Sequence, residues 1–119
     1  MQLWHNPRCS KSREAKQLLD AAGAAYTERR YLDDPPTTAE LDAVLAALDK
    51  DPWEIVRFGE PVARELDLKN RRRADRAGWL AVLSEDPELI ERPILVTGDG
   101  RAAVGRPPEA IARLLGERC

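Results

Sequence analysis

Hydrophobic and polar positions follow two different periods in the first third of the chain. Residues 1–5 are apolar-leaning and lead into His5-Asn6-Pro7, which predicts a strand that runs into a turn. From Ser10 the apolar positions recur at helical spacing, and Gly23 is expected to end this helix. Its inward face is expected to comprise Ala15, Leu18, Leu19 and Ala22. Residues 25–31 carry β-forming side chains at alternating positions and predict a second strand, which ends before the break at 33–36.

The middle of the chain has a helical pattern. Thr37 and Glu40 have the spacing of a capping box, so a second helix is expected to open at Thr37. Its buried stripe is predicted to consist of Leu41, Val44, Leu45 and Leu48. Short helical pieces are expected through residues 52–91. A third apolar cluster in that stretch contains Trp79, Leu80 and Leu83.

The end of the chain predicts a hairpin and a closing helix. Residues 93–97 are rich in β-branched side chains and predict a buried strand. Gly98-Asp99-Gly100 is expected to turn this strand, through a three-residue loop, into a partner at 101–104. Pro107-Pro108 is expected to start the last helix. The inward positions of that helix are predicted to be Ala110, Ile111, Leu114 and Leu115.

This order of elements predicts an α/β fold. A β-α-β unit, a helical block and a β-β-α unit together have the outline of a thioredoxin-like mixed sheet with an inserted helical subdomain. We expect the core at about 1–36 and 92–119, and the insertion at about 37–91. The 119 residues are expected to form a single domain.

Composition narrows the class of protein. With 43% hydrophobic and 34% charged residues, the chain is unlike disordered or collagenous proteins. It has no run of 18 apolar residues and no apolar segment near the start, so neither a membrane span nor a secretory signal is expected. The formal charge of −2 argues against nucleic acid as a partner, and makes a solvated face the favoured interpretation of the basic run Lys69–Arg73. Two distant cysteines, Cys9 and Cys119, fit a reduced, cytoplasmic protein.

Cys9 is the strongest candidate for chemistry. It lies between the first strand and the first helix, where unbonded N–H groups and the helix dipole stabilise a thiolate or hold an anion. Arg8, Lys11 and Arg13 add positive charge nearby, and His5 can add a hydrogen bond or a further charge. These effects favour a reactive thiol over a buried structural cysteine.

The spacing around Cys9 excludes three related kinds of site. Cys9-x-x-Ser12 lacks the second thiol of a local dithiol cycle. A phosphatase-type C-x5-R loop would need arginine where Ala15 stands. One histidine and two distant cysteines do not make a credible zinc site.

Four motifs lie along nearly the full length of the chain: His-Asn-Pro-x-Cys-x-x-Ser-Arg at 5–13, Val56-Arg57 before Glu60-Pro61, Glu91-Arg92-Pro93-Ile94-Leu95-Val96 and Gly105-Arg106-Pro107. They carry a resemblance to the glutaredoxin-coupled arsenate reductase family, ArsC. It implies Cys9 as the nucleophile, tuned by His5 and hydrogen-bonded by Ser12. It also implies three arginines that hold the oxyanion and share one cleft with Cys9, namely Arg57, Arg92 and Arg106. Pro93 is expected to be cis, as in thioredoxin-like proteins.

The implied activity is reduction of arsenate to arsenite, with glutathione and glutaredoxin as electron donors and no metal or bound organic cofactor. Cys119, at the C-terminus, is expected to be dispensable. Two alternatives stay open. One is a thiol oxidoreductase with another substrate. The other is an Spx-like regulator that binds RNA polymerase, although such regulators usually have a second cysteine where this chain has Ser12.

Overall fold

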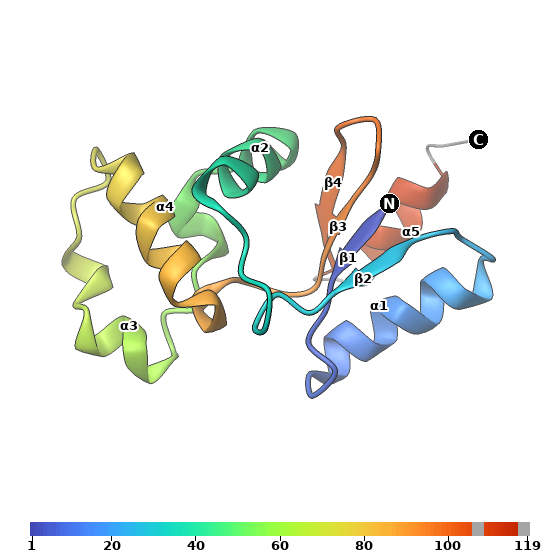
Figure 1. Cartoon of the computed structure of the whole chain (residues 1–119), viewed down its shortest axis with the longest axis horizontal. Coiled ribbons are helices and arrows are strands. Elements are labelled where there is room, and N and C mark those ends of the chain that lie inside the picture. Colours follow the sequence, from blue (N-terminus) through green and yellow to red (C-terminus); the bar gives the residue numbers. More distant parts are fainter. Residues whose placement is uncertain (106–108, 117–119) are drawn as a thin grey trace. The chain divides into compact units, whose positions relative to one another are not determined.

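Residues 1–105 and 109–116 are described by the structure, a computed structural model shown in Figure 1. They fall into two units. The first, here called the sheet unit, comprises Met1–Asp34 and Arg92–Cys119, and the second, the helical unit, comprises Pro35–Glu91. The sequence predicted that the insertion begins at about 37, two residues after the start of the helical unit in the structure.

The sheet unit is built on four short strands: β1 (Gln2–Trp4), β2 (Thr27–Arg29), β3 (Ile94–Val96) and β4 (Ala102–Val104). Their order is β2-β1-β3-β4. β1 and β2 are parallel, whereas β1–β3 and β3–β4 are antiparallel, so the sheet is mixed as predicted. This topology, with its helices on one face, is a thioredoxin-like fold.

Each strand is shorter than the range predicted for it. The second strand shows this most clearly, because it was expected over 25–31 and pairs only over Thr27–Arg29. Beyond it, the N–H groups of Asp33 and Asp34 both donate to the carbonyl oxygen of Arg30, which closes a turn. The alternating pattern of side chains therefore extends beyond Thr27–Arg29, the residues whose backbone pairs with β1.

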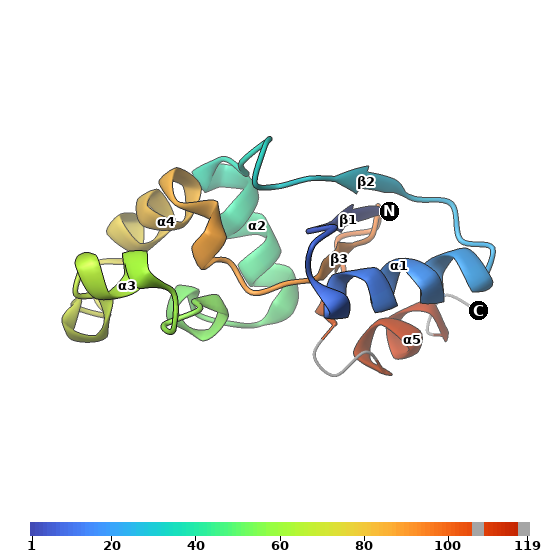
Figure 2. The same ribbon diagram turned by 90° about the horizontal axis from the view of Figure 1, so that it is seen from below.

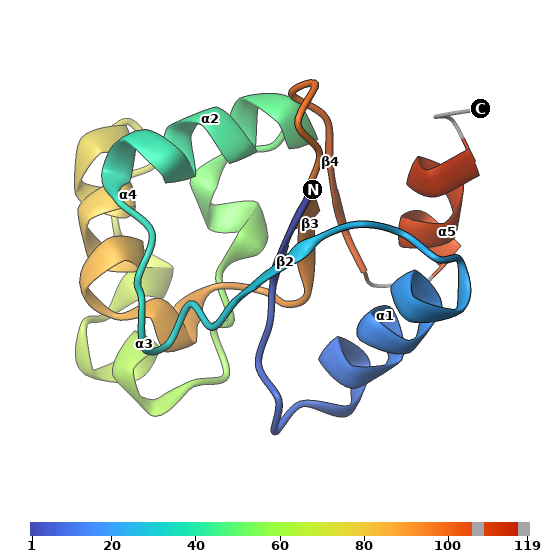
Figure 3. The same cartoon turned by 45° about the vertical axis from the view of Figure 1, so that its right-hand side comes forward.

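Two helices cover one face of this sheet. Figures 2 and 3 show α1 (Ser10–Ala21) and α5 (Glu109–Gly116) side by side. Their apolar side chains meet those of the central strands in one buried cluster, which comprises Leu3, Ala15, Leu19, Leu95, Ile111 and Leu114. Burial of these side chains is the main stabilising term for the unit.

The end of α1 is fixed by Gly23, as predicted. Gly23 has φ = 65°, a conformation that glycine adopts without a steric penalty. The Ala24 N–H donates to Leu19 O at 3.0 Å and the Gly23 N–H to Asp20 O at 3.1 Å, which is a Schellman motif. The prediction that Ala22 faces inward is wrong: it is the C-cap residue and is exposed, because the helix has already ended there. Leu18 is only partly buried.

The hairpin has the predicted three-residue loop. Beyond the last strand pair, the Thr97 N–H donates to Arg101 O at 2.8 Å and closes a loop of residues 98–100. Gly100 has φ = 85°, the left-handed conformation typical of the last residue of such loops. On α5, Ile111 and Leu114 are buried as expected, whereas Ala110 is partly exposed. The predicted start of that helix at Pro107-Pro108 and the side chain of Leu115 lie outside what the structure describes.

The helical unit contains α2 (Thr38–Leu48), α3 (Pro61–Glu65) and α4 (Arg76–Glu85). Single 3₁₀ turns lie between them at Pro52–Ile55 and Leu68–Asn70, and another, Pro87–Leu89, follows α4. The capping box forms as predicted: Thr37 Oγ1 accepts from the Glu40 N–H at 3.1 Å, and Glu40 Oε1 accepts from the Thr37 N–H at 3.0 Å. No helix within residues 1–105 and 109–116 is long and apolar enough to cross a membrane.

The core of the helical unit lies between α2 and α4. Its buried side chains include Leu41, Val44, Leu45, Trp79, Leu80 and Leu83. Leu48, expected in the same stripe, is only partly buried near the end of α2. An ion pair between Arg76 Nη2 and Asp42 Oδ1, at 2.7 Å, joins α4 to α2 at the surface.

Candidate functional site

The loop between β1 and α1 is folded by local hydrogen bonds. Asn6 O accepts from the Cys9 N–H at 3.0 Å, and Asn6 Oδ1 accepts from the Arg8 N–H at 3.0 Å. Asn at the first position and Pro7 at the second are the residues that such a turn favours. The Arg13 guanidinium donates to Pro7 O at 2.9 Å and ties α1 back to the turn. The sequence of this loop therefore places Cys9 at the N-cap of α1.

The Cys9 thiol lies in a setting that stabilises its thiolate. The side chain is 9% exposed, in an extended N-cap conformation with φ = −95°. Burial raises the pKa of the Cys9 thiol, but hydrogen bonds from the backbone N–H groups of Ser12 and Lys11 lower it. The charge of Arg92 and a hydrogen bond from its side chain lower it further, so that the pKa lies below the usual range of a thiol.

Arg92 reaches Cys9 from the other end of the sequence. It directly precedes β3, whose Ile94 pairs with Trp4 at the end of β1. The Arg92–Pro93 bond is cis, as expected. Strand pairing therefore places Arg92 next to the loop that follows β1, and one of the three predicted arginines lies at the thiol.

Close packing fixes the backbone beside Arg92. The Gly105 N–H donates to Pro93 O at 2.8 Å. A Cβ atom on residue 105 would lie 2.7 Å from Pro93 Cγ and 2.9 Å from Ile111 Cδ1, so only glycine fits there without a shift. Gly105 thus allows the end of β4 to approach the proline that anchors Arg92.

His5 and Ser12 form a buried pair behind the loop, 3% and 0% exposed. Ser12 Oγ accepts from the Asn6 N–H at 2.9 Å and lies 2.7 Å from His5 Nδ1. The Ser12 hydroxyl can donate to His5 Nδ1 when the histidine proton is on Nε2, the nitrogen that faces Glu28. Burial lowers the pKa of His5, against the opposing charge of Glu28, so the ring is neutral at pH 7.

This geometry changes the role expected of Ser12. Ser12 was predicted to hydrogen-bond the Cys9 thiolate. The group of Ser12 that does so is the backbone N–H. Its hydroxyl instead joins His5 to the turn at Asn6. Of the two contributions considered for His5, a neutral ring supplies a hydrogen bond and no positive charge.

Glu28 extends this buried pair towards the surface, and the sequence analysis did not identify it. Glu28 Oε1 lies 3.9 Å from His5 Nε2 and accepts from Arg30 Nε at 3.0 Å, while Glu28 Oε2 lies 3.2 Å from Lys16 Nζ. Arg30 and Lys16 hold the pKa of the Glu28 carboxyl below its usual range despite partial burial, so that the group stays charged. The parallel register pairs Glu28 with Leu3, two residues before His5. Because side chains alternate along β1, Leu3 and His5 lie on the same face of the sheet, and Glu28 shares that face through its pairing with Leu3. The sequence alone does not give this register.

For the other two predicted arginines, Arg57 and Arg106, proximity to Cys9 stays a prediction. Arg57 belongs to the helical unit, where its Nη1 lies 2.6 Å from Glu60 Oε1 and its N–H donates to Leu89 O. Arg106 lies outside the described residues, as does Cys119. A shared cleft of Cys9 with all three arginines stays a prediction.

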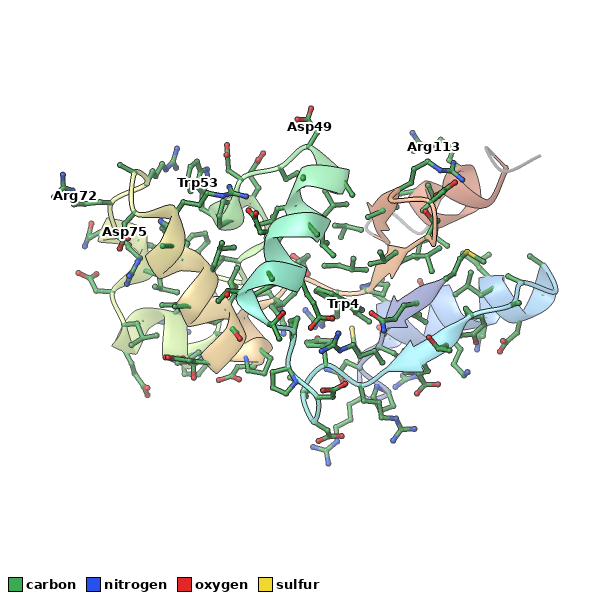
Figure 4. All side chains as sticks on the ribbon, turned by 45° about the horizontal axis from the view of Figure 1, so that its top comes forward. Trp4, Asp49, Trp53, Arg72, Asp75 and Arg113 are labelled. Carbon is green, nitrogen blue, oxygen red and sulfur yellow. The ribbon has the colours of Figure 1, made fainter. Side chains whose placement is uncertain are left out.

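The basic run Lys69–Arg73 lies in the helical unit. Figure 4 shows Trp53, Arg72 and Asp75 at one end of this unit. There the Arg73 guanidinium lies 5.1 Å from the centre of the Trp53 ring, and Arg71 Nη2 lies 3.0 Å from Asp75 Oδ2. At least two of these cations therefore make contacts within the unit.

No group of three or more His, Cys, Asp or Glu side chains within the described ranges, 1–105 and 109–116, could hold a metal ion.

Known proteins share both the sequence and the structure. The model of the ArsC family matches residues 4–114. A protein encoded in the glnII region of Streptomyces viridochromogenes, of uncharacterised function, is 50% identical over 93% of this chain and 95% of its own length. An arsenate reductase of Neisseria meningitidis (strain Z2491) is 40% identical over 97% of both chains. The solved structure of an arsenate reductase from Vibrio cholerae superposes with a TM-score of 0.86 at 38% identity, over 95% of this chain and 97% of the other.

Proposed function

The chain belongs to the ArsC family, and from this we propose that it reduces arsenate to arsenite with Cys9 as the nucleophile. The observation that carries the proposal is the convergence of Arg92 and two backbone N–H groups on the Cys9 sulfur. A thiolate and a doubly charged oxyanion repel each other, so their reaction needs positive charge fixed beside the sulfur. Relatives named arsenate reductases cover nearly the whole chain.

The first step forms a bond between sulfur and arsenic. The Cys9 thiolate attacks arsenate, and one arsenic oxygen leaves as water after protonation, so that arsenic stays in its +5 state. We assign Arg57, Arg92 and Arg106 to the arsenate oxygens, because a planar guanidinium matches a tetrahedral oxyanion with two parallel hydrogen bonds. Of the three, Arg92 has the geometric support of its contact with Cys9.

The second step transfers two electrons to arsenic. Glutathione thiolate attacks the Cys9 sulfur, an S–S bond forms, and the S–As bond breaks with its electron pair staying on arsenic. Arsenite leaves in the +3 state, and Cys9 is left in a mixed disulfide with glutathione. A glutaredoxin thiolate then takes over the glutathionyl group and releases the Cys9 thiolate. An external thiol is required because Ser12 stands where a local resolving cysteine would be.

His5 and Ser12 act as positioning residues in this scheme. The buried hydroxyl fixes the first turn of α1 to the loop, so the two backbone N–H groups stay aimed at the sulfur. A neutral His5 accepts from Ser12 without competing with Arg92 for the oxyanion.

A coupled assay tests the proposal. Arsenate-dependent oxidation of NADPH is followed in the presence of glutathione, glutaredoxin and glutathione reductase. The oxidation should depend on Cys9 and on each of these three components. Cys119→Ser serves as the control and should keep full turnover. If the wild-type protein alkylates readily at Cys9 but never consumes NADPH with arsenate, it is a thiol oxidoreductase of another substrate. Capture of RNA polymerase by the same inactive protein would favour the regulator instead.

A further inference from the structure

Glu28 is held in place from three sides, next to the buried His5 ring. Its backbone belongs to β2, where it pairs with Leu3 of β1. Arg30 Nε donates to Glu28 Oε1 at 3.0 Å, and Lys16 Nζ, on α1, lies 3.2 Å from Glu28 Oε2. Burial raises the pKa of the Glu28 carboxyl, but the hydrogen bonds from Arg30 and Lys16 outweigh this and lower it, so the group is a carboxylate near neutrality. A fixed negative charge therefore lies 3.9 Å from His5 Nε2.

The two nitrogens of the His5 ring face different groups. Nδ1 lies 2.7 Å from Ser12 Oγ, and Nε2 faces Glu28 Oε1. Burial lowers the pKa of His5, against the opposing charge of Glu28, so the ring is neutral and carries a single N–H hydrogen. A carboxylate only accepts, and its charge favours the tautomer whose N–H points towards it. The hydrogen is therefore expected on Nε2, which leaves Nδ1 as an acceptor for the Ser12 hydroxyl.

The other charges that act on the His5 ring are positive. Lys16 and Arg13 come from α1, and Arg30 follows β2. Each lowers the pKa of His5 and so helps to keep the ring neutral. Glu28 acts in the opposite sense and supplies the negative charge that distinguishes one ring nitrogen from the other.

Ser12 connects the His5 ring to the thiol. Its hydroxyl oxygen accepts from the Asn6 N–H at 2.9 Å, and its backbone N–H is one of the two that donate to the Cys9 sulfur. Hydrogen bonds thus run in one direction from Asn6 through Ser12 to His5 and end at the charge of Glu28, and each polarises the next. The residue that receives this support is also a donor to the thiolate.

We propose that Glu28 is a positioning residue for the Cys9 thiolate, since its carboxylate fixes the His5 tautomer whose Nδ1 accepts from Ser12. This role deepens the proposed function and rests on it in taking Cys9 as the nucleophile. It differs from that of a surface ion pair, because Glu28, Lys16 and Arg30 could hold β2 against α1 without any effect on the tautomer of His5.

The tautomer can be measured directly, because the chain has one histidine. Two-bond ¹H–¹⁵N correlation spectra of the wild-type protein, prepared without a histidine tag, distinguish a ring protonated on Nε2 from one protonated on Nδ1. We expect the Nε2–H form to predominate near neutrality. A ring with its hydrogen on Nδ1, or a doubly protonated ring, would overturn the proposal whether or not any variant folds.

Glu28→Gln tests whether the carboxylate acts on the thiol, and Glu14→Gln is the matched control. Glu14 is exposed on α1 and its Oε2 lies 3.7 Å from Lys11 Nζ, so the control removes the same charge from the same unit at a different ion pair. Both variants are made in a Cys119→Ser background. The pH midpoint of Cys9 alkylation by iodoacetamide is then measured beside the His5 spectrum.

The two effects that Glu28→Gln could have on this midpoint differ in sign. Removal of a nearby negative charge stabilises a thiolate, so a purely electrostatic effect lowers the midpoint. Loss of positioning weakens the N–H donors to the sulfur, so we expect the midpoint to rise by about half a pH unit to one unit, together with a measurable Nδ1–H population of His5. Glu14→Gln should leave the tautomer unaltered and should not raise the midpoint. A midpoint that falls or stays constant in Glu28→Gln, or an unaltered tautomer, would overturn the proposal.

Neither measurement uses arsenate, which separates this proposal from the proposed function. A protein that reduces arsenate normally but carries the His5 hydrogen on Nδ1 would refute the role of Glu28 and retain the reductase. Conversely, the expected tautomer and a raised midpoint in Glu28→Gln, in a protein without arsenate turnover, would retain the role of Glu28 and refute arsenate as the substrate.

Discussion

The sheet unit and the helical unit bury different kinds of side chain. Within the described residues, the buried polar side chains are His5, Ser12 and Thr97, and all three belong to the sheet unit. The buried side chains of the helical unit are apolar, and its ion pair between Arg76 and Asp42 lies at the surface. Stability alone is served well by the second arrangement, since a buried polar group is costly unless it is hydrogen-bonded.

The difference shows where the molecule positions its chemistry. Two of the three buried polar side chains, His5 and Ser12, hydrogen-bond each other behind the Cys9 loop. Their burial excludes water and fixes the first turn of α1, whose N–H groups face the thiol. Changes in the sheet unit should therefore alter the reactivity of Cys9, whereas changes in the helical core should alter stability alone.

The largest effect is expected at Cys9. Cys9→Ser should abolish arsenate turnover, because a serine hydroxyl is neither ionised near neutrality nor able to form the mixed disulfide. NADPH consumption in the coupled assay measures this, with Cys119→Ser as the matched control. Turnover that survives in Cys9→Ser would remove Cys9 from the mechanism.

Arg92→Ala should lower kcat/KM for arsenate by about 10²–10³-fold, the usual loss when one preorganised oxyanion donor is removed. Arg92→Lys should recover little, since lysine lacks the planar fork. Alkylation of Cys9 by iodoacetamide should slow far less than arsenate turnover.

The control for Arg92 comes from the helical unit. Arg72→Ala removes an exposed arginine there and should change neither kcat/KM for arsenate nor the rate of Cys9 alkylation. Parallel losses of alkylation and turnover in Arg92→Ala would mean that Arg92 acts only on the thiol and does not bind arsenate.

Leu83→Ala should separate stability from reactivity in the helical unit. Leu83 is 0% exposed in α4, and its truncation should lower the free energy of unfolding by about 2–5 kcal/mol. Urea denaturation measures the loss. In the folded variant, the pH midpoint of Cys9 alkylation should equal that of the wild type, and a shift of that midpoint would contradict the division of roles between the units.

Ser12→Ala should change both the free energy of unfolding and the pH midpoint of Cys9 alkylation. Loss of the hydroxyl leaves the Asn6 N–H and His5 Nδ1 without this partner, at a cost of about 1–3 kcal/mol in the free energy of unfolding. The wild-type alkylation midpoint should lie below that of a free thiol, and the variant midpoint should be higher, because the turn that aims the N–H groups is loosened. An unchanged midpoint would make Ser12 a purely structural residue.

The smallest effect is a pH dependence from His5, the one histidine of the chain. Burial lowers its pKa in the folded protein, while Glu28 acts against this and Lys16, Arg30 and Arg13 act with it. Below about pH 6.5 the unfolded chain therefore takes up a proton that the folded chain does not. Stability present above that pH should decline as the pH falls, by at most about 1.4 kcal/mol per unit. His5→Asn should flatten this part of the profile in urea titrations, and an unaltered slope would contradict it.

Several features followed from the sequence because they depend on neighbours along the chain. Asn6 and Pro7 predict a turn, and the helical period from Ser10 places Cys9 at the helix N-terminus. Thr37 with Glu40 predicts its capping box, and the glycines of 98–100 predict the hairpin loop. Each rests on interactions that span about four residues, so the local sequence is sufficient. The resemblance to the ArsC family implied the three arginines, of which the structure brings Arg92 to the thiol.

Other features were decided by the tertiary structure alone. The lengths of the strands depend on where each partner ends, so the alternating pattern over 25–31 overstated a strand that pairs only at Thr27–Arg29. Glu28 reaches His5 through the register of β1 with β2. Gly105 is required because the end of β4 packs on the ring of Pro93. These contacts join residues 12 to 25 positions apart, and Arg92 and Cys9 lie 83 positions apart. Whether such residues meet is determined by strand pairing and packing across the whole sheet, which no local pattern records.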